Sequence, residues 1–205
     1  MNIRKSDLTK KNILEAAENE FSEKGLYGAR VDEIALKANI NKRMIYQYFG
    51  NKEELYKEVL EVVYNRLGEC EDIVISKNAN WIDKISELVR VYFAFLKNNS
   101  AYVRMLMWEN LNYGKYFEEK CLGHSKDNIR KELERIIILG KELGDINDSI
   151  EPDQVFQTLI ACSFNYFSNM YTLSRIMNED LMSEAAMEKR INVVTDMIIE
   201  YVTKK

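Results

Sequence analysis

Residues 31–55 read VDEIALKANINKRMIYQYFGNKEEL, and this stretch decides the fold because it holds two short helical runs joined by a tight turn. The turn is Asn-Ile-Asn at residues 39–41. Asparagine tolerates a left-handed backbone, and its side chain caps a following helix. The second run, residues 42–49, places Ile45 and Phe49 four positions apart on one side. We expect both side chains to be buried, which is the layout of a helix-turn-helix.

The other positions of the second run carry cationic, amide and phenolic side chains. A helix of about two turns is not stable alone in water, so neighbouring helices must hold this side out to solvent. A helix face of this kind is typical of the recognition helix that enters the DNA major groove. The side chains on it are Lys42, Arg43, Tyr46, Gln47 and Tyr48.

The composition predicts an all-α protein. The chain of 205 residues is 46% hydrophobic and 30% charged, as in globular proteins. One proline and eight glycines leave little material for the turns of a β-rich fold. No apolar run approaches the roughly 18–20 residues that span a membrane, and the N-terminus has no apolar signal-peptide core. We therefore expect a cytoplasmic protein without a membrane partner.

The charge is distributed unevenly along the chain. The net charge is −4, yet residues 1–52 hold ten Lys/Arg and seven Asp/Glu, so the remainder is strongly acidic. A basic N-terminal segment on an acidic body fits a protein that meets phosphate groups at one end only.

Further helices follow from apolar periodicity, caps and breaks. Gly25 is expected to end the first helix, which begins near residue 6 or 9. Asn51 and Glu54 have the spacing of a capping box, and Pro152 suits the opening turn of a helix. The later predicted helices span about residues 51–67, 81–97, 101–111, 125–143, 153–177 and 183–202.

The last two predicted helices bear on assembly. The helix over residues 153–177 is apolar nearly all round, which indicates burial on both sides. Its own domain can cover one side and a second copy of the chain the other. We interpret residues 153–177 and 183–202 as half of an intersubunit four-helix bundle. The alternative is a large core within one chain.

Residues 11–60, KNILEAAENEFSEKGLYGARVDEIALKANINKRMIYQYFGNKEELYKEVL, combine several features at fixed spacing. They are an apolar helix that ends in Glu-Lys-Gly, then Ile-Ala, then Ile-Tyr-x-Tyr-Phe, then Asn-Lys-Glu-Glu-Leu. This combination resembles the N-terminal domain of the tetracycline-repressor (TetR) family of one-component transcriptional regulators. Beyond residue 60 the resemblance is one of helix pattern and length.

The resemblance implies roles for individual residues. Lys42 and Arg43 stand at the start of the recognition helix, where the family approaches base edges. Tyr46 and Tyr48 fall on positions that touch bases or phosphates. Lys52 matches a phosphate-binding lysine, whose ammonium would meet the same phosphate as the amides of the following helix.

The chain also departs from the family pattern. The turn usually reads Ala-Gly-Val-Ser, and here residues 38–41 read Ala-Asn-Ile-Asn. Arg30 follows Ala29 where Thr or Ser is common, so a hydroxyl cap is lost and a possible phosphate ligand is gained. Asp32 occupies a position that can be basic. The expected DNA-binding residues are therefore Arg30, Lys42, Arg43, Tyr46, Gln47, Tyr48 and Lys52.

The mechanism that the resemblance implies is a two-state repressor with two domains. Residues 1–52 would bind DNA, and residues 53–205 would bind an effector and form a homodimer. Two recognition helices would enter successive major grooves of a near-palindromic double-stranded operator until a small, mostly apolar or aromatic effector releases them. The candidate pocket residues are Tyr92, Phe95, Met105, Trp108, Tyr113, Phe164, Asn165 and Tyr171. The alternative is that they belong to the core, since aromatic residues at helical spacing are more often core than pocket lining.

The sequence also bears on two other classes of protein. An enzyme is disfavoured because the chain has a single histidine, His124, and no phosphate loop, nucleophile elbow or metal-binding pair. We therefore expect no catalytic residue, metal or cofactor. A helical adaptor without specific DNA binding is the second alternative, and the polar face of the second run speaks against it.

Cys70, Cys121 and Cys162 show no paired spacing and are interpreted as reduced thiols.

Overall fold

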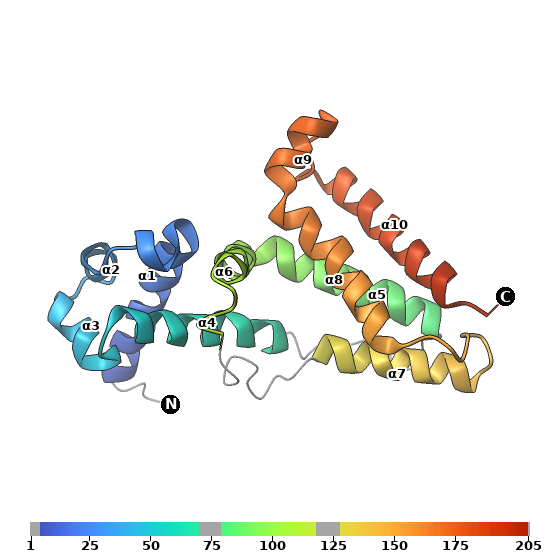
Figure 1. Ribbon diagram of the computed structural model, residues 1–205, viewed down its shortest axis with the longest axis horizontal. Coiled ribbons are helices and arrows are strands. Elements are labelled where there is room, and N and C mark those ends of the chain that lie inside the picture. Colours follow the sequence, from blue (N-terminus) through green and yellow to red (C-terminus); the bar gives the residue numbers. More distant parts are fainter. Residues whose placement is uncertain (1–4, 70–78, 118–127, 205) are drawn as a thin grey trace. The chain divides into compact units, whose positions relative to one another are not determined.

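The computed structural model describes residues 5–69, 79–117 and 128–204. These residues form ten α-helices and no strand, and one isolated antiparallel bridge joins Ile146 and Thr203 (Figure 1). The predicted all-α fold is confirmed. The helices are α1 (Lys5–Gly28), α2 (Val31–Lys37), α3 (Lys42–Phe49), α4 (Lys52–Glu69), α5 (Trp81–Asn98), α6 (Ser100–Leu111), α7 (Asn128–Glu142), α8 (Pro152–Ser168), α9 (Met170–Met177) and α10 (Glu184–Val202).

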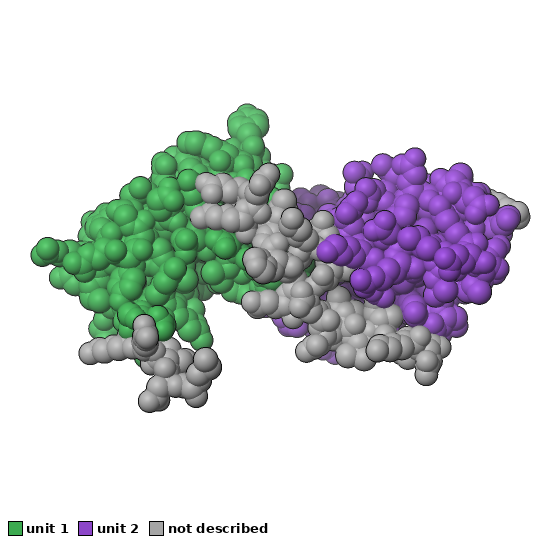
Figure 2. Space-filling view, turned by 90° about the horizontal axis from the view of Figure 1, so that it is seen from below, with its two compact units in different colours: residues 1–67, 100–125 green, residues 68–99, 126–205 purple. Residues whose placement is uncertain are grey.

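The chain divides into two compact units, which Figure 2 shows in different colours. Unit 1 comprises residues 1–67 and 100–125, and therefore adds α6 to the first four helices. Unit 2 comprises residues 68–99 and 126–205.

In unit 1, α1 and α6 pack together. Ile13, Ala17 and Phe21 form the buried face of α1, as their spacing predicts. The regular helix breaks at the expected glycine, since Gly25 has φ 66° and ψ 176°. The indole of Trp108 on α6 lies against this glycine and donates a 3.3 Å hydrogen bond to the Ser22 carbonyl.

Two asparagines in the turn and one after it shape the helix-turn-helix. Asn39 has φ 53°, the left-handed conformation expected of it. The Asn41 side chain accepts a 2.8 Å hydrogen bond from the Arg43 amide and so caps α3. Asn51 caps α4 by accepting from the Glu54 amide at 2.9 Å. The reciprocal half of the expected capping box is absent here, because the Glu54 carboxylate accepts from Lys57 instead.

Unit 2 is built around α5, which packs against α7, α8 and α10. Its apolar face is buried, with Ile85, Leu88 and Phe93 almost fully enclosed. Phe93 meets the rings of Tyr166 and Phe167 from α8 at centroid distances of 5.9 and 5.8 Å. The core of this unit thus rests on aliphatic and aromatic contacts between helices.

The prediction of one helix over residues 153–177 is wrong. Asn169, with φ −112° and ψ 5°, separates α8 from α9, and α9 turns away from the line of α8 (Figure 1). The Asn169 side chain donates to the Asn165 carbonyl at 3.3 Å and to the Ser168 hydroxyl at 3.0 Å. Asparagine competes for backbone groups in this way, which ends helices. The predicted place of Pro152, in the first turn of α8, is confirmed.

No helix in the described part of the chain is long and apolar enough to cross a membrane. Cys162 is a free, half-buried thiol on α8. Cys70, Cys121 and His124 lie outside the described residues.

Candidate nucleic-acid interface

The outward face of α3 carries exposed polar side chains. Arg43 and Gln47 are exposed, and Tyr46 and Tyr48 keep 41% and 37% of their surface open to solvent. Within the described residues, the Arg43 guanidinium has no ion pair or hydrogen bond. Ile45 and Phe49 are the buried side chains of α3 and lie on its other side. The helix therefore offers cationic, amide and phenolic groups on one surface.

Lys42, at the start of α3, is held by an ion pair. Its ammonium lies 2.9 Å from a carboxylate oxygen of Asp32 on α2. This hydrogen bond raises the pKa of Lys42. The two side chains keep 43% and 58% of their surface open to solvent, so the pair contributes little to stability. Asp32 on α2 thus holds the ammonium of Lys42 at the start of α3.

Lys52 and Arg30 are the expected DNA-binding residues outside α3, and both belong to unit 1. Lys52 is half-buried at the start of α4, where burial lowers its pKa and the Glu20 carboxylate acts in the opposite direction. Arg30 is exposed, and it precedes α2 without a side-chain cap. A hollow lined by Leu26, Tyr27 and the first residues of α4 adjoins Lys52.

Glu20 is a fully buried carboxylate that ties α1 to α2. It accepts hydrogen bonds from Lys24 at 2.7 Å, from Lys37 at 3.0 Å and from the Arg30 amide at 3.2 Å. Burial raises the pKa of Glu20, but these bonds more than offset burial and hold it at about 2. Lys24 lies one helical turn away on α1, but Lys37 is 17 residues away on α2, and periodicity alone did not distinguish this glutamate from the exposed ones.

We expect the free energy of unfolding to decrease as the pH falls, because of Glu20. Its folded pKa of about 2 lies below the ordinary 4.5, so the ionised carboxylate stabilises the fold above about pH 4.5. That contribution is lost as the pH falls from about 4.5 toward 2. Glu20→Gln should lower the free energy of unfolding by about 2–3 kcal/mol at pH 7. It should also make that free energy depend less steeply on pH below about 4.5.

Urea titrations between pH 2.5 and 7 measure this effect. The matched control is Glu15→Gln, an exposed position on the same helix. If the free energy of unfolding fell as steeply with decreasing pH in Glu20→Gln as in the parent chain, the prediction would be wrong.

The residues expected to line an effector pocket are divided between the two units. Three are buried in the cores, Tyr92 and Phe95 in unit 2 and Met105 in unit 1. Trp108 packs on Gly25, and Tyr113 is 98% exposed. On α8 and α9, Phe164 is half-buried, whereas Asn165 and Tyr171 are exposed.

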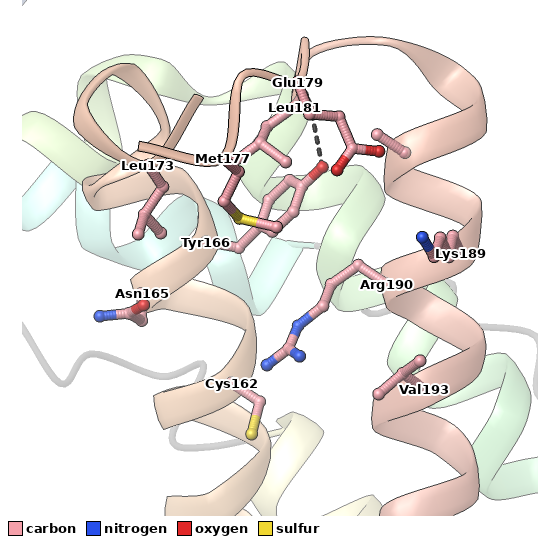
Figure 3. A pocket seen from close by; sticks show the side chains of 11 residues that line it. Cys162, Asn165, Tyr166, Leu173, Met177, Glu179, Leu181, Lys189, Arg190 and Val193 are labelled. Carbon is pink, nitrogen blue, oxygen red and sulfur yellow. Dashed lines mark hydrogen bonds between the residues drawn. The ribbon is translucent and has the colours of Figure 1, made fainter. Parts of the chain in front are cut away.

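Unit 2 contains a cavity of about 360 Å³ between α8, α9 and α10 (Figure 3). Of the eight expected pocket residues, Asn165 lines it. Sequence reasoning missed the other polar lining side chains, Glu179, Lys189 and Arg190. A charged side chain on an amphipathic helix usually faces solvent. The order of charged and apolar residues in α10 therefore did not indicate that Arg190 turns toward α8.

These features define the class of protein. Two short helices joined by an asparagine-capped turn, with a polar second helix anchored from beneath, are a helix-turn-helix of the DNA-binding type. Comparison with known proteins gives the family. The profile of "Bacterial regulatory proteins, tetR family" matches residues 13–59, and that of "Tetracyclin repressor-like, C-terminal domain" matches residues 82–198. The chain belongs to the TetR family of transcriptional regulators.

Curated relatives agree with this assignment over most of the chain. The transcriptional repressor NicS of Pseudomonas putida is 29% identical across 95% of this chain and 92% of its own. The transcriptional repressor SCO4008 of Streptomyces coelicolor is 32% identical across 86% of this chain and 87% of its own. Both are named as regulators rather than enzymes.

Solved structures share the fold at low identity. A putative TetR-family regulator from Mesorhizobium loti has a TM-score of 0.73 at 16% identity, over 99% of this chain and 100% of its own. FadR from Bacillus subtilis, solved in complex with stearoyl-CoA, has a TM-score of 0.69 at 19% identity, over 94% and 98%.

Proposed function

We propose that this protein is a cytoplasmic, ligand-responsive repressor that binds a near-palindromic operator as a homodimer. The observation that carries the proposal is the outward face of α3, where Arg43 has no partner within the described residues and both tyrosines reach solvent. Arginine binds guanine edges with two hydrogen bonds, which makes Arg43 the strongest candidate for base reading. The set proposed to contact DNA is Arg30, Lys42, Arg43, Tyr46, Gln47, Tyr48 and Lys52.

The roles within this set differ. Arg43, Gln47 and the tyrosines project from α3 and would reach base edges or nearby phosphates. Lys52 stands at the capped start of α4, where its ammonium and the helix amides together suit a phosphate. The DNA-binding function is assigned to residues 1–52, and effector binding and dimerisation to residues 53–205.

Exposed apolar side chains support dimerisation through the C-terminal helices. On α10, Val193, Met197 and Tyr201 follow one another at four-residue spacing and are 42%, 49% and 59% exposed. A row of this kind marks an interaction surface on a helix. We assign the dimer contact to α8 and α10, the helices that carry residues 153–168 and 184–202. A symmetric contact there would form a four-helix bundle.

Release requires an effector that binds the two conformations of the repressor with different affinity. A few kcal/mol of difference suffices to move such an equilibrium. The effector is proposed to be small and mostly apolar or aromatic, and to bind among the helices of the C-terminal region. One protein of the same fold, FadR, was solved with an acyl-CoA ligand.

A gel shift on the promoter region of the protein's own gene tests the proposal. We expect a shift that weakens as salt rises from about 50 to 200 mM, because phosphate contacts release counterions. Arg43→Gln should weaken specific binding about 10- to 100-fold, since a bidentate base contact is worth about 1–3 kcal/mol. Arg175→Gln, an exposed arginine on α9, is the control. An absent or salt-insensitive shift would favour a helical adaptor.

A further inference from the structure

The cavity between α8, α9 and α10 combines an apolar wall with polar groups. Leu173, Met177, Leu181 and Val193 supply aliphatic and thioether surface. The buried ring of Tyr166 closes one side, held by a hydrogen bond of 2.5 Å from its hydroxyl to the Leu181 carbonyl. A volume of about 360 Å³ falls within the range of small-molecule sites, about 300–1,000 Å³.

Arg190 is the charged group that turns inward. Its half-buried side chain extends from α10 into the space between α10 and α8, on the side of Cys162 (Figure 3). Within the described residues, the guanidinium has no ion pair or hydrogen bond, although Glu179 also lines the cavity. With Lys189 as a second cation, the lining carries one more positive charge than negative.

The positive charge of Arg190 affects the pKa of Tyr166, which also lines the cavity. Burial raises the pKa of the Tyr166 phenol, Glu179 raises it further, and Arg190 lowers it. A partly desolvated guanidinium without a carboxylate is unfavourable unless an anion accompanies it. The cavity therefore offers a position for a negative group next to apolar surface.

We propose that this cavity binds a small amphipathic anion, whose carboxylate pairs with Arg190 and whose apolar body lies against Leu173, Met177 and Val193. The planar guanidinium can bind a carboxylate through two parallel hydrogen bonds, which orients the ligand as well as holding it. A flexible methionine adapts to apolar bodies of different shape. The inference rests on the proposed function, since it names the ligand class of the effector.

The test uses three probes that share an apolar phenylalkyl group and differ in charge: 4-phenylbutyrate, 4-phenylbutanol and 4-phenylbutylamine. Isothermal titration calorimetry on the full chain, without DNA, should show binding of the carboxylate. The alcohol should bind at least tenfold more weakly, and the amine should not bind. In spectra of methyl-labelled methionines, the Met177 signal, assigned with Met177→Leu, should shift on addition of the carboxylate. The Met105 signal should not, since that side chain is buried in unit 1.

Three variants assign the interaction. Arg190→Gln should weaken carboxylate binding at least tenfold and abolish the preference over the alcohol. Arg175→Gln, whose side chain does not line the cavity, should bind as the parent chain does. Leu173→Phe, on α9 and outside the exposed row of α10, should reduce binding of both carboxylate and alcohol by filling the cavity. Circular dichroism and sedimentation velocity on each variant report folding and assembly.

Several outcomes would overturn the inference. They are no binding of 4-phenylbutyrate at millimolar concentration, an unchanged charge preference in Arg190→Gln, or a Met177 signal that does not move. Loss of the dimer in folded Arg190→Gln, with no ligand binding by the parent chain, would assign the guanidinium to a contact between copies. Operator binding is measured separately by gel shift, so a failure of DNA recognition leaves the calorimetric result intact. Binding without any loss of operator affinity would refute the regulatory role of the cavity.

Discussion

Replacing Phe49 with alanine is expected to lower the free energy of unfolding of unit 1 by about 3–5 kcal/mol, the range for a buried phenylalanine. The ring is 7% exposed, and the Lys10 ammonium lies 5.5 Å from its centroid. Together with Ile45, which is fully buried, it holds α3 onto the rest of unit 1. Its loss leaves a cavity beneath a helix that cannot persist alone.

Tyr46→Ala is the matched control on the opposite face of the same helix. Tyr46 is 41% exposed, so its truncation should change stability by less than about 1 kcal/mol while weakening operator binding. Urea unfolding followed by Trp108 fluorescence, in a Trp81→Phe background, reports unit 1 alone, because these are the two tryptophans of the chain. A large stability loss for Tyr46→Ala and a small one for Phe49→Ala would mean that the faces of α3 are assigned the wrong way round.

Gly25→Ala is expected to destabilise unit 1 by about 2–6 kcal/mol for two separate reasons. The backbone at Gly25, φ 66° and ψ 176°, lies in a region that is open almost only to glycine, and an alanine there costs about 1–3 kcal/mol. A Cβ atom at this position would also stand 2.8 Å from Cδ2 of the Trp108 indole. Relief of that overlap requires the ring to move, at a cost of about 1–3 kcal/mol.

Two further variants separate these contributions. Gly50 also has a positive φ, 78°, but a Cβ atom there would meet nothing within 4 Å, so Gly50→Ala carries the backbone strain alone. Trp108→Leu combined with Gly25→Ala removes the overlap and keeps the strain. Urea unfolding followed by circular dichroism should therefore rank Gly25→Ala as more destabilising than Gly50→Ala. The double variant should lose less stability than Gly25→Ala and Trp108→Leu lose when their separate effects are added. Equal losses for both glycines, with no coupling, would exclude a role for the indole.

The helix-turn-helix could be read from the sequence because its determinants are local. Ile45 and Phe49 lie one helical turn apart, and both proved buried. Asn39, Asn41 and Asn51 adopt the left-handed and capping roles that short polar side chains take within a few residues of their own backbone. These interactions span at most four residues, so the linear order of side chains nearly determines them.

The residues that line a pocket are harder to predict from the sequence than the helix-turn-helix. An aromatic side chain at helical spacing can belong to the core or to the wall of a pocket. Tyr92, Phe95 and Met105 are enclosed in the cores, and Tyr113 is 98% exposed. The spacing of such residues indicates which face of a helix is apolar. It does not indicate whether a neighbouring helix fills that face completely or leaves a hollow.

By itself, the sequence determined the all-α class, the helix-turn-helix and the cationic, phenolic face of α3, since these depend on contacts within one or two helical turns. Only the tertiary structure decided that α6 joins the first four helices, that Glu20 is buried between two lysines, and that Arg190 turns into a cavity. Each of these depends on groups that are distant along the chain or on which way a helix is rotated against its neighbours. Packing of the whole chain sets that rotation, and no short stretch of residues encodes it.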